Sequence, residues 1–301
     1  MARKSVCTLV CDLRGVGVAS LQHRKFDMLS RTKLACAVSL ALIAGVAQSA
    51  DWSNASIGLT YGTKFKEPGN AAEVKKTIVT LQYVGGFKYG VNFFTLDMLK
   101  SDVNNPARNS TRGAQEVYVV YSNSLSLGKL GGSPVKFGPV RDVAWQTGFD
   151  FNSKNDAFGA GLVKFIAGPK VEFDVPGLLT LGLLYYKEHN NNSFAGRNVH
   201  FDGTARLAAV WNFPFQAGTP AVFKGFANFT GAKGLDGGGA QTSPETWLDS
   251  ALLWDIGSVA GTPKTFYAGI GYQYIKHKFG NRASLPGTKV SAPELKFEAH
   301  F

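Results

Sequence analysis

The chain has 301 residues, of which 18% are charged and 12% aromatic, and its length suits one large all-β unit or two ordinary domains. No apolar run in the body of the chain approaches the roughly 20 residues of a membrane-spanning helix, which excludes a helical membrane protein. The net charge of +11 is modest beyond residue 50, where 25 basic residues face 19 acidic ones without a Lys/Arg run, and this argues against a nucleic-acid partner.

The first 50 residues are predicted to be a leader that is not part of the fold. From Met28 the chain reads MLSRTKLACAVSLALIAGVAQSADW, a basic start followed by a short apolar core and small residues. This pattern predicts a secretory signal peptide over residues 28 to 50. Residues 1 to 27 resemble neither a signal nor a domain, so we expect them to be an upstream extension from a wrong start site. The alternatives are an uncleaved anchor and a lipoprotein modified at Cys36.

After residue 50 the sequence falls into twelve stretches of about ten residues that alternate apolar and polar side chains. In residues 143 to 151 one face is expected to hold Val143, Trp145, Phe149 and Phe151, and the other Ala144, Gln146, Gly148 and Asp150. Residues 163 to 173 and 199 to 213 are read as two further strands, the second with Phe201 on its apolar face. In KYGVNFFTLDML the consecutive Phe93 and Phe94 require one inward ring or a bulge.

The connections between these stretches are predicted to alternate in length. The long ones are polar and cover residues 64 to 75, 101 to 113, 189 to 198, 232 to 244 and 280 to 291. Brief turns are expected at residues 85 to 88 and 174 to 177. A soluble β-sandwich also alternates, but the signal peptide, the strand length and the aromatic residues near strand ends favour an outer-membrane barrel. The length predicts about twelve antiparallel strands in residues 51 to 301, with ten or fourteen also compatible.

The last residues, ELKFEAHF, extend the same alternation to the C-terminus. Leu295, Phe297, Ala299 and Phe301 are expected to face outward, and Glu294, Lys296, Glu298 and His300 inward. A C-terminal aromatic residue in phase with an amphipathic strand resembles the assembly signal of bacterial outer-membrane proteins. We therefore expect Phe301 to be recognised by the β-barrel assembly machinery.

Several segments resemble the nucleoside-specific channel family of outer-membrane proteins (Tsx-like). They include ADWSNASIGLTYGTKFKEP, GAQEVYVVYSN, FDFNSKNDAF, FKGFANFTGAKG, PETWLDSALLWDIG and GYQYIKHKFGN, and they are spread over nearly all of residues 50 to 301. The resemblance implies a monomeric twelve-stranded barrel in a Gram-negative outer membrane, surrounded by outer-membrane lipid, with a narrow lumen that passes nucleosides. Some members of this family also serve as phage or colicin receptors.

The inward phase supplies both aromatic faces for stacking a base and polar groups for binding ribose hydroxyls. The candidate stackers are Tyr118, Tyr186, Phe226, Trp247 and Tyr267, and the candidate polar residues are Glu116, Asp150, Lys164, Lys170, Glu172, Asp202, Arg206, Lys224, Asn228, Asp249 and Glu298. Both signs of charge occur, which favours neutral polar solutes over simple anions or cations. The alternative for each charged residue is a cross-barrel ion pair that stabilises a water-filled or plugged lumen.

The sequence carries no strong sign of an enzyme. The His-x-Ser-Asn-Gly stretch of an outer-membrane phospholipase is absent, and no His sits suitably beside the acidic residues for the Asp-His couple of an omptin-like protease. No cofactor or metal site is expected. The predicted function is passive diffusion of nucleosides or similar small polar solutes. The alternatives are a surface receptor or adhesin with no selective transport and, third, an outer-membrane lipase or protease.

Overall fold

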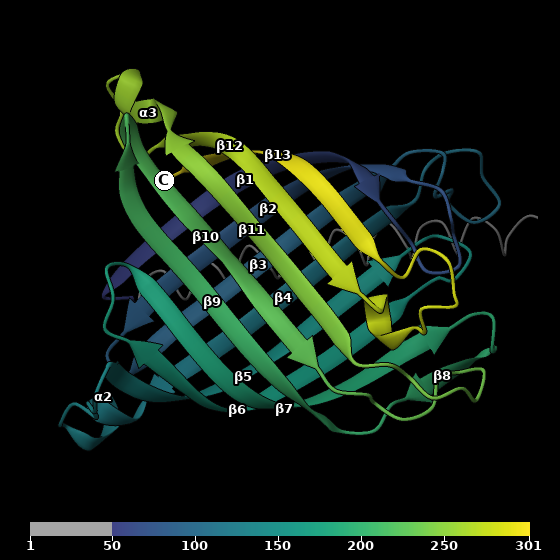
Figure 1. Cartoon of the computed structure of the whole chain (residues 1–301), viewed down its shortest axis with the longest axis horizontal. Helices are drawn as coiled ribbons and strands as arrows, with labels where there is room; N and C mark the ends of the chain where they lie inside the picture. The colour runs from purple at the N-terminus through teal and green to yellow at the C-terminus, as the bar shows by residue number, and fades with distance from the viewer. Residues whose placement is uncertain (1–49) are drawn as a thin grey trace, which may run out of the picture. The chain divides into compact units, whose positions relative to one another are not determined.

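The computed structural model describes residues 50–301, which form a single closed sheet of antiparallel strands (Figure 1). Twelve strands make the wall and a thirteenth, β8, pairs only with β7. Their bounds are β1 Trp52–Phe65, β2 Val74–Phe87, β3 Gly90–Ser101, β4 Gln115–Ser126, β5 Val140–Lys154, β6 Gly161–Phe173, β7 Leu178–Asn192, β8 Arg197–His200, β9 Thr204–Ala217, β10 Thr219–Thr230, β11 Glu245–Asp255, β12 Phe266–Lys276 and β13 Val290–His300. The predicted twelve-stranded antiparallel barrel is confirmed.

Each wall strand pairs with its neighbours in the chain, and β1 closes the ring by pairing with β13. In that seam Leu59 lies opposite Phe297, and Gly58 lies opposite Glu298. The closed ring leaves no free sheet edge, because every wall strand is hydrogen-bonded on both sides. Closure is what allows a sheet to exist in lipid, where an unpaired backbone amide has no water to bind.

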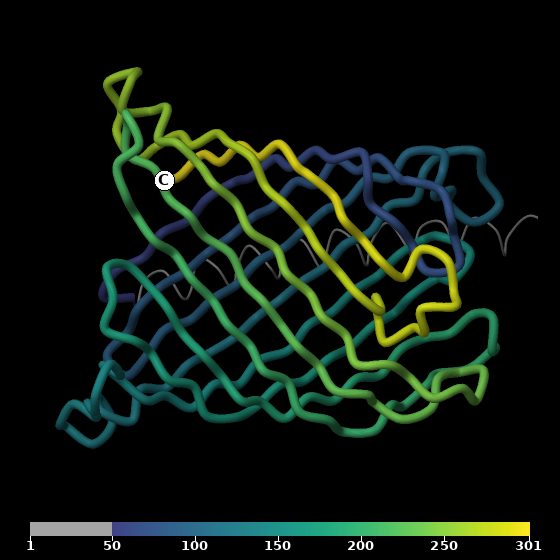
Figure 2. The backbone as a smooth tube through the Cα atoms, in the orientation of Figure 1, coloured from purple at the N-terminus to yellow at the C-terminus, as the bar shows by residue number. Residues whose placement is uncertain are grey.

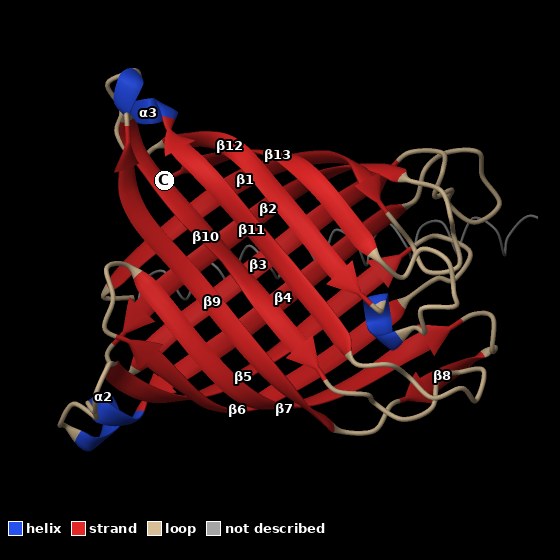
Figure 3. Cartoon of the chain, in the orientation of Figure 1, coloured by secondary structure: helices blue, strands red, loops and turns tan. Residues whose placement is uncertain are grey.

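The two ends of the barrel differ (Figures 2 and 3). One, the turn end, holds the C-terminus, the tight connections at residues 88–89, 174–177 and 218, and two longer connections that contain the short helices α2 (Leu127–Gly131) and α3 (Ile256–Val259). The other, the loop end, holds the long connections 66–73, 102–114, 155–160, 193–203, 231–244 and 277–289, which include β8 and the 3-10 turn η1 (Lys278–Gly280). The predicted turn at 174–177 is confirmed, whereas the turn predicted at 85–88 lies at 88–89.

The outer face of the wall is apolar. On β5 the exposed fractions are 49% for Trp145 and 47% for Phe149, while Ala144 and Asp150 of the other phase are buried. Other large exposed side chains of the same outward register are Ile57, Leu59, Met98, Phe151, Val163, Phe165, Leu181, Leu183, Leu207, Phe229, Ile270 and Leu295. A closed barrel that exposes this much apolar surface on its outside is an outer-membrane barrel, since lipid is the solvent such a surface requires.

The C-terminal strand follows the predicted phase. Leu295 is 63% exposed and Phe297 40% exposed on the outside, whereas Glu294 is buried on the inside. The ambiguous pair on β3 is also resolved without a bulge, because the registers of β3 with β2 and β4 run unbroken through it. Phe93 has the inward phase of Asp97, and Phe94 has the outward phase of Met98.

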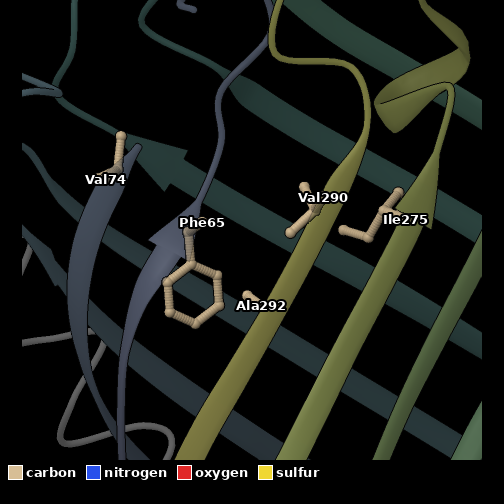
Figure 4. Packing of buried hydrophobic residues seen from close by; sticks show 5 residues of the cluster. All are labelled: Phe65, Val74, Ile275, Val290 and Ala292. Atoms are coloured by element: carbon tan, nitrogen blue, oxygen red, sulfur yellow. The ribbon is translucent and has the colours of Figure 1, made fainter. Parts of the chain in front are cut away.

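A small apolar cluster lies at the loop end, where β1 and β2 meet β12 and β13 (Figure 4). Its fully covered members are Phe65, Val74, Ile275, Val290 and Ala292, with Ile78 and Trp247 packed against them. The register shift between β1 and β2 at Gly62 and Phe65 brings the Phe65 ring over Gly62. A Cβ on Gly62 would lie 2.7 Å from that ring, so this position requires glycine. The cluster therefore packs this part of the loop end with apolar side chains.

One strand prediction is wrong. Residues 199–213 are not a single strand, because the chain leaves the sheet between β8 and β9 at residues 201–203. Phe201 therefore does not lie on the outer face of a strand; it is 7% exposed and packs under the Lys233 ammonium group, 4.1 Å from the ring centroid.

The predicted signal peptide and upstream extension lie outside the described residues, except for Ala50. No helix within residues 50–301 is long and apolar enough to cross a membrane.

Candidate functional site in the barrel lumen

Contacts between strands that are not neighbours identify the inner face of the wall. The Lys224 ammonium group of β10 lies 2.6 Å from Glu298 of β13, and the Lys164 ammonium group of β6 lies 6.0 Å from the Trp247 ring of β11. Such contacts must run through the interior, because two or more strands separate the partners along the wall. These four residues therefore face the lumen, and the register assigns the other inward residues from them.

All but one of the predicted site residues share this inward register. They are Glu116 and Tyr118 on β4, Asp150 on β5, Lys164, Lys170 and Glu172 on β6, Tyr186 on β7, Arg206 on β9, Lys224, Phe226 and Asn228 on β10, Trp247 and Asp249 on β11, and Tyr267 on β12. The exception is Asp202, which lies in the exposed connection between β8 and β9, where its backbone N–H donates to the Lys233 carbonyl at 2.9 Å. Asp202 is thus a rim residue and not part of the strand wall.

A central cluster joins β4, β5 and β6. The Tyr118 hydroxyl donates to Asp150 Oδ2 at 2.8 Å and accepts from Lys164 Nζ at 2.8 Å. The same ammonium group lies 3.6 Å from the Asp150 carboxylate. Because it also approaches the Trp247 ring, Lys164 reaches from one side of the lumen to the other. The central cluster therefore combines aromatic rings with groups of both charges.

Across the lumen, Asp249 and Phe226 extend this cluster on β10 and β11. The Phe226 and Trp247 ring centroids are 6.4 Å apart at an interplanar angle of 45°. Lys296 Nζ lies 2.7 Å from Asp249 Oδ1 and 3.0 Å from Glu294 Oε2, reaching past β12. Gly271 makes this crossing feasible, since a Cβ there would lie 2.5 Å from Lys296 Cε. Asn228 also has the inward register of β10, where it lies directly opposite Trp247 of β11.

A second group stands nearer the loop end. The Arg206 guanidinium carbon lies 4.1 Å from the Tyr186 ring centroid, and Arg206 Nε donates to Thr230 Oγ1 at 2.9 Å. The Tyr186 hydroxyl donates to the buried carboxylate of Glu188, which also pairs with Lys233. A cavity of about 10 Å³, room for about one water molecule, lies beside this group and is lined by Tyr186, Thr230, Gly231, Lys233, Ser243, Glu245 and Gly280.

The lumen is more open at the turn end than at the loop end. The side chains of Arg141, Glu172 and Lys224, all near the turn end, are 32%, 28% and 21% exposed. Those of Lys164 and Glu188, nearer the loop end, are 4% and 2% exposed. The inward charged groups are therefore more closely covered near the loop end than near the turn end.

Glu67, in the connection between β1 and β2, joins several elements at the loop end. Its carboxylate accepts from Lys76 on β2 and lies 3.0 Å from Lys154 Nζ on β5 and 3.3 Å from Lys278 Nζ on η1. Lys278 Nζ also donates to the Lys66 carbonyl at 2.8 Å. We call Glu67, Lys76, Lys154 and Lys278 the Glu67 latch, because one buried carboxylate ties two loops to two strands.

The latch is charged and buried, which shifts the pKa values of its groups. Burial would raise the pKa of Glu67, but the ammonium groups, Lys278 foremost, outweigh burial and hold the pKa well below its ordinary value. Burial lowers the pKa of Lys278 to about 8, despite the attraction of Glu67, and two further lysines add repulsion. Near neutral pH the carboxylate is therefore ionised and tightly held.

Sequence reasoning missed the latch and the Glu188–Lys233 pair. Glu67 precedes Pro68 and Gly69, so it looks like a solvated loop residue. Lys76, Lys154 and Glu188 have the inward phase of their strands and were open to the same reasoning as the predicted residues. Lys233 and Lys278 are loop residues, for which strand phase gives no signal.

No protein-family model and no curated protein sequence matches this chain. Solved structures with a similar fold include the KdgM porin (10% identity, 82% of this chain and 99% of that chain covered, TM-score 0.42) and the NanC porin (10%, 81% and 98%, TM-score 0.44). A third is the translocator domain of the autotransporter NalP from Neisseria meningitidis (13%, 90% and 97%, TM-score 0.34). At such low identities and TM-scores, the function has to be argued from the chain's own residues, and the resemblance to nucleoside channels stays a prediction.

Proposed function

We propose that this barrel is a passive outer-membrane channel for small polar solutes and that it favours flat neutral ones such as nucleosides. The observation that carries the proposal is the central cluster, in which Tyr118, Asp150 and Lys164 stand opposite Trp247 and Asp249 across the lumen. Aromatic faces suit a base, and the carboxylates and ammonium groups suit ribose hydroxyls. The balance of charge disfavours a channel selective for simple ions.

The inner charges are mostly engaged with one another, which sets the strength of solute binding. A hydroxyl that enters the central cluster exchanges one hydrogen bond for another, because Tyr118, Asp150 and Lys164 already satisfy each other. Such an exchange gains little free energy, typically about 1 kcal/mol for each hydrogen bond. Weak sites of this kind favour passage, since a conducting channel must also release its solute.

The experiment is single-channel conductance of the purified protein in a planar bilayer, with adenosine, thymidine and a sugar of similar size. We expect a small conductance that millimolar nucleosides reduce and the sugar does not. Trp247→Ala should weaken the nucleoside block severalfold, whereas Phe149→Ala, which removes an outward ring from β5, should leave it unchanged. A conducting barrel that responds equally to nucleosides and sugar would refute the preference and leave a general channel.

The Glu67 latch favours one competing function. A loop end closed by buried ion pairs suits a surface receptor or adhesin, whose loops bind a partner while the lumen stays shut. Such a barrel would be silent in the bilayer at all voltages. It would also depend on exposed loop residues, such as those of 102–114, and not on Trp247.

A further inference from the structure

Two histidines face each other on the outside of the loop end, away from the lumen. His189 lies near the end of β7 and His200 ends β8, and they are directly opposite in the register of these two strands. Their Nδ1 atoms are 2.7 Å apart, and both side chains are exposed. The ring centroids are only 4.5 Å apart, with the planes at 68°, so the two nitrogens meet at an angle and not head-on.

This spacing fits two ligands of one metal ion. Imidazole nitrogens bind divalent transition metals at about 2.0 Å, so two of them are about 2.8 Å apart at a right-angled metal and about 3.3 Å apart at a tetrahedral one. The observed 2.7 Å matches the right-angled case. Tetragonal coordination by nitrogen and oxygen is typical of Cu²⁺ and Ni²⁺, and Cu²⁺ binds most tightly of the first-row divalent ions.

We propose that His189 and His200 form a two-histidine site for Cu²⁺ on the outer rim of the barrel. Without metal, the Nδ1–H of one ring donates to the Nδ1 lone pair of the other. Metal binding moves that proton to Nε2 of the same ring, and the two Nδ1 lone pairs then bind the ion. Water completes the coordination, because no group of three or more His, Cys, Asp or Glu residues converges anywhere in residues 50–301.

The site has a structural consequence. β8 pairs only with the last residues of β7, through four residue pairs, and is not part of the closed wall. A metal ion bridging His189 and His200 would fasten this hairpin at the base of the connection between β8 and β9. The proposal does not depend on conduction, since both histidines lie outside the lumen.

The test is a titration of the tag-free purified protein with CuCl₂, followed by calorimetry and by electron paramagnetic resonance. We expect one Cu²⁺ per chain with a tetragonal spectrum and coupling to two nitrogens. His189→Ala and His200→Ala should each weaken binding at least tenfold. His277→Ala is the matched control, because His277 Nδ1 is hydrogen-bonded to the Pro244 carbonyl at 2.9 Å and not to another histidine. This variant should bind Cu²⁺ as the wild type does.

Proteolysis gives an independent readout. Cu²⁺ should slow cleavage within residues 193–203 in the wild type and in His277→Ala, but not in His200→Ala. Absence of Cu²⁺ binding by the wild type, or binding that survives both histidine substitutions, would overturn the proposal and leave an ordinary hydrogen-bonded pair.

Discussion

The Glu67 latch makes a quantitative prediction. Glu67→Gln keeps the size of the side chain and removes its charge. Lys76 and Lys278 then lose their carboxylate partner, while Lys154 keeps Asp156, 2.9 Å away. Removing one partner of a buried ion pair costs about 3–5 kcal/mol, because the remaining charges stay buried and uncompensated. The amide can still accept a hydrogen bond, so the lower figure applies. At about 1.4 kcal/mol for each factor of ten, the balance between closed and open loop ends shifts roughly 100-fold towards open.

The assay is the open probability of single channels, with Glu73→Gln as the matched control. Glu73 lies in the same connection but is exposed and forms no ion pair among the described residues. We expect Glu67→Gln to raise the open probability at least tenfold and Glu73→Gln to leave it unchanged. Heat-dependent mobility on a gel separates opening from unfolding, because an intact barrel keeps its compact mobility. If a folded Glu67→Gln barrel conducts as the wild type does, the latch does not close the channel.

Further predictions concern titration, packing and assembly. Because the pKa of Lys278 falls to about 8 in the folded protein, the unfolded chain binds more protons between about pH 8 and pH 10. Thermal stability, measured by heat-dependent gel mobility, should therefore rise with pH in this window, and Lys278→Met should abolish the rise. Gly271→Val should force Lys296 away from Asp249 and lower the midpoint of thermal unfolding by several degrees, whereas the exposed Gly131→Val should change it little. Deleting Phe301 should reduce the fraction of barrel in the outer membrane without changing conductance per channel, and normal assembly would refute its role as a signal.

The strands of the barrel wall and their outward faces could be predicted from the sequence, because strand geometry is local. Alternation has a period of two residues, so a few alternating side chains determine which face of a strand meets lipid. This logic correctly separated Trp145 and Phe149 from Asp150, and it predicted the phase of the C-terminal strand. It went wrong between β8 and β9, where the alternation around Phe201 continues but the backbone leaves the sheet.

The loop end was not open to prediction in the same way. The partners of Glu67 stand 9, 87 and 211 residues away in the chain, and no local pattern relates a carboxylate before Pro68 to lysines at such separations. The same holds for Lys233, whose partner Glu188 precedes it by 45 residues. The alternation along a strand assigns a side chain to the lumen, but only the folded loops determine with which opposite charge it forms an ion pair.

This division has a consequence for selectivity. Among the predicted residues, Glu172 and Lys224 are partly exposed near the turn end, whereas the missed Glu67, Glu188 and Lys233 are buried at the loop end. In such a channel we expect the loop end to limit the rate, because a solute must displace buried ion pairs there and only exchange exposed ones elsewhere. Substitutions at Lys224 or Glu172 should therefore alter the rate less than substitutions at Glu67 or Lys233. A barrel whose conductance changed mainly with the turn-end residues would place the barrier at the opposite mouth.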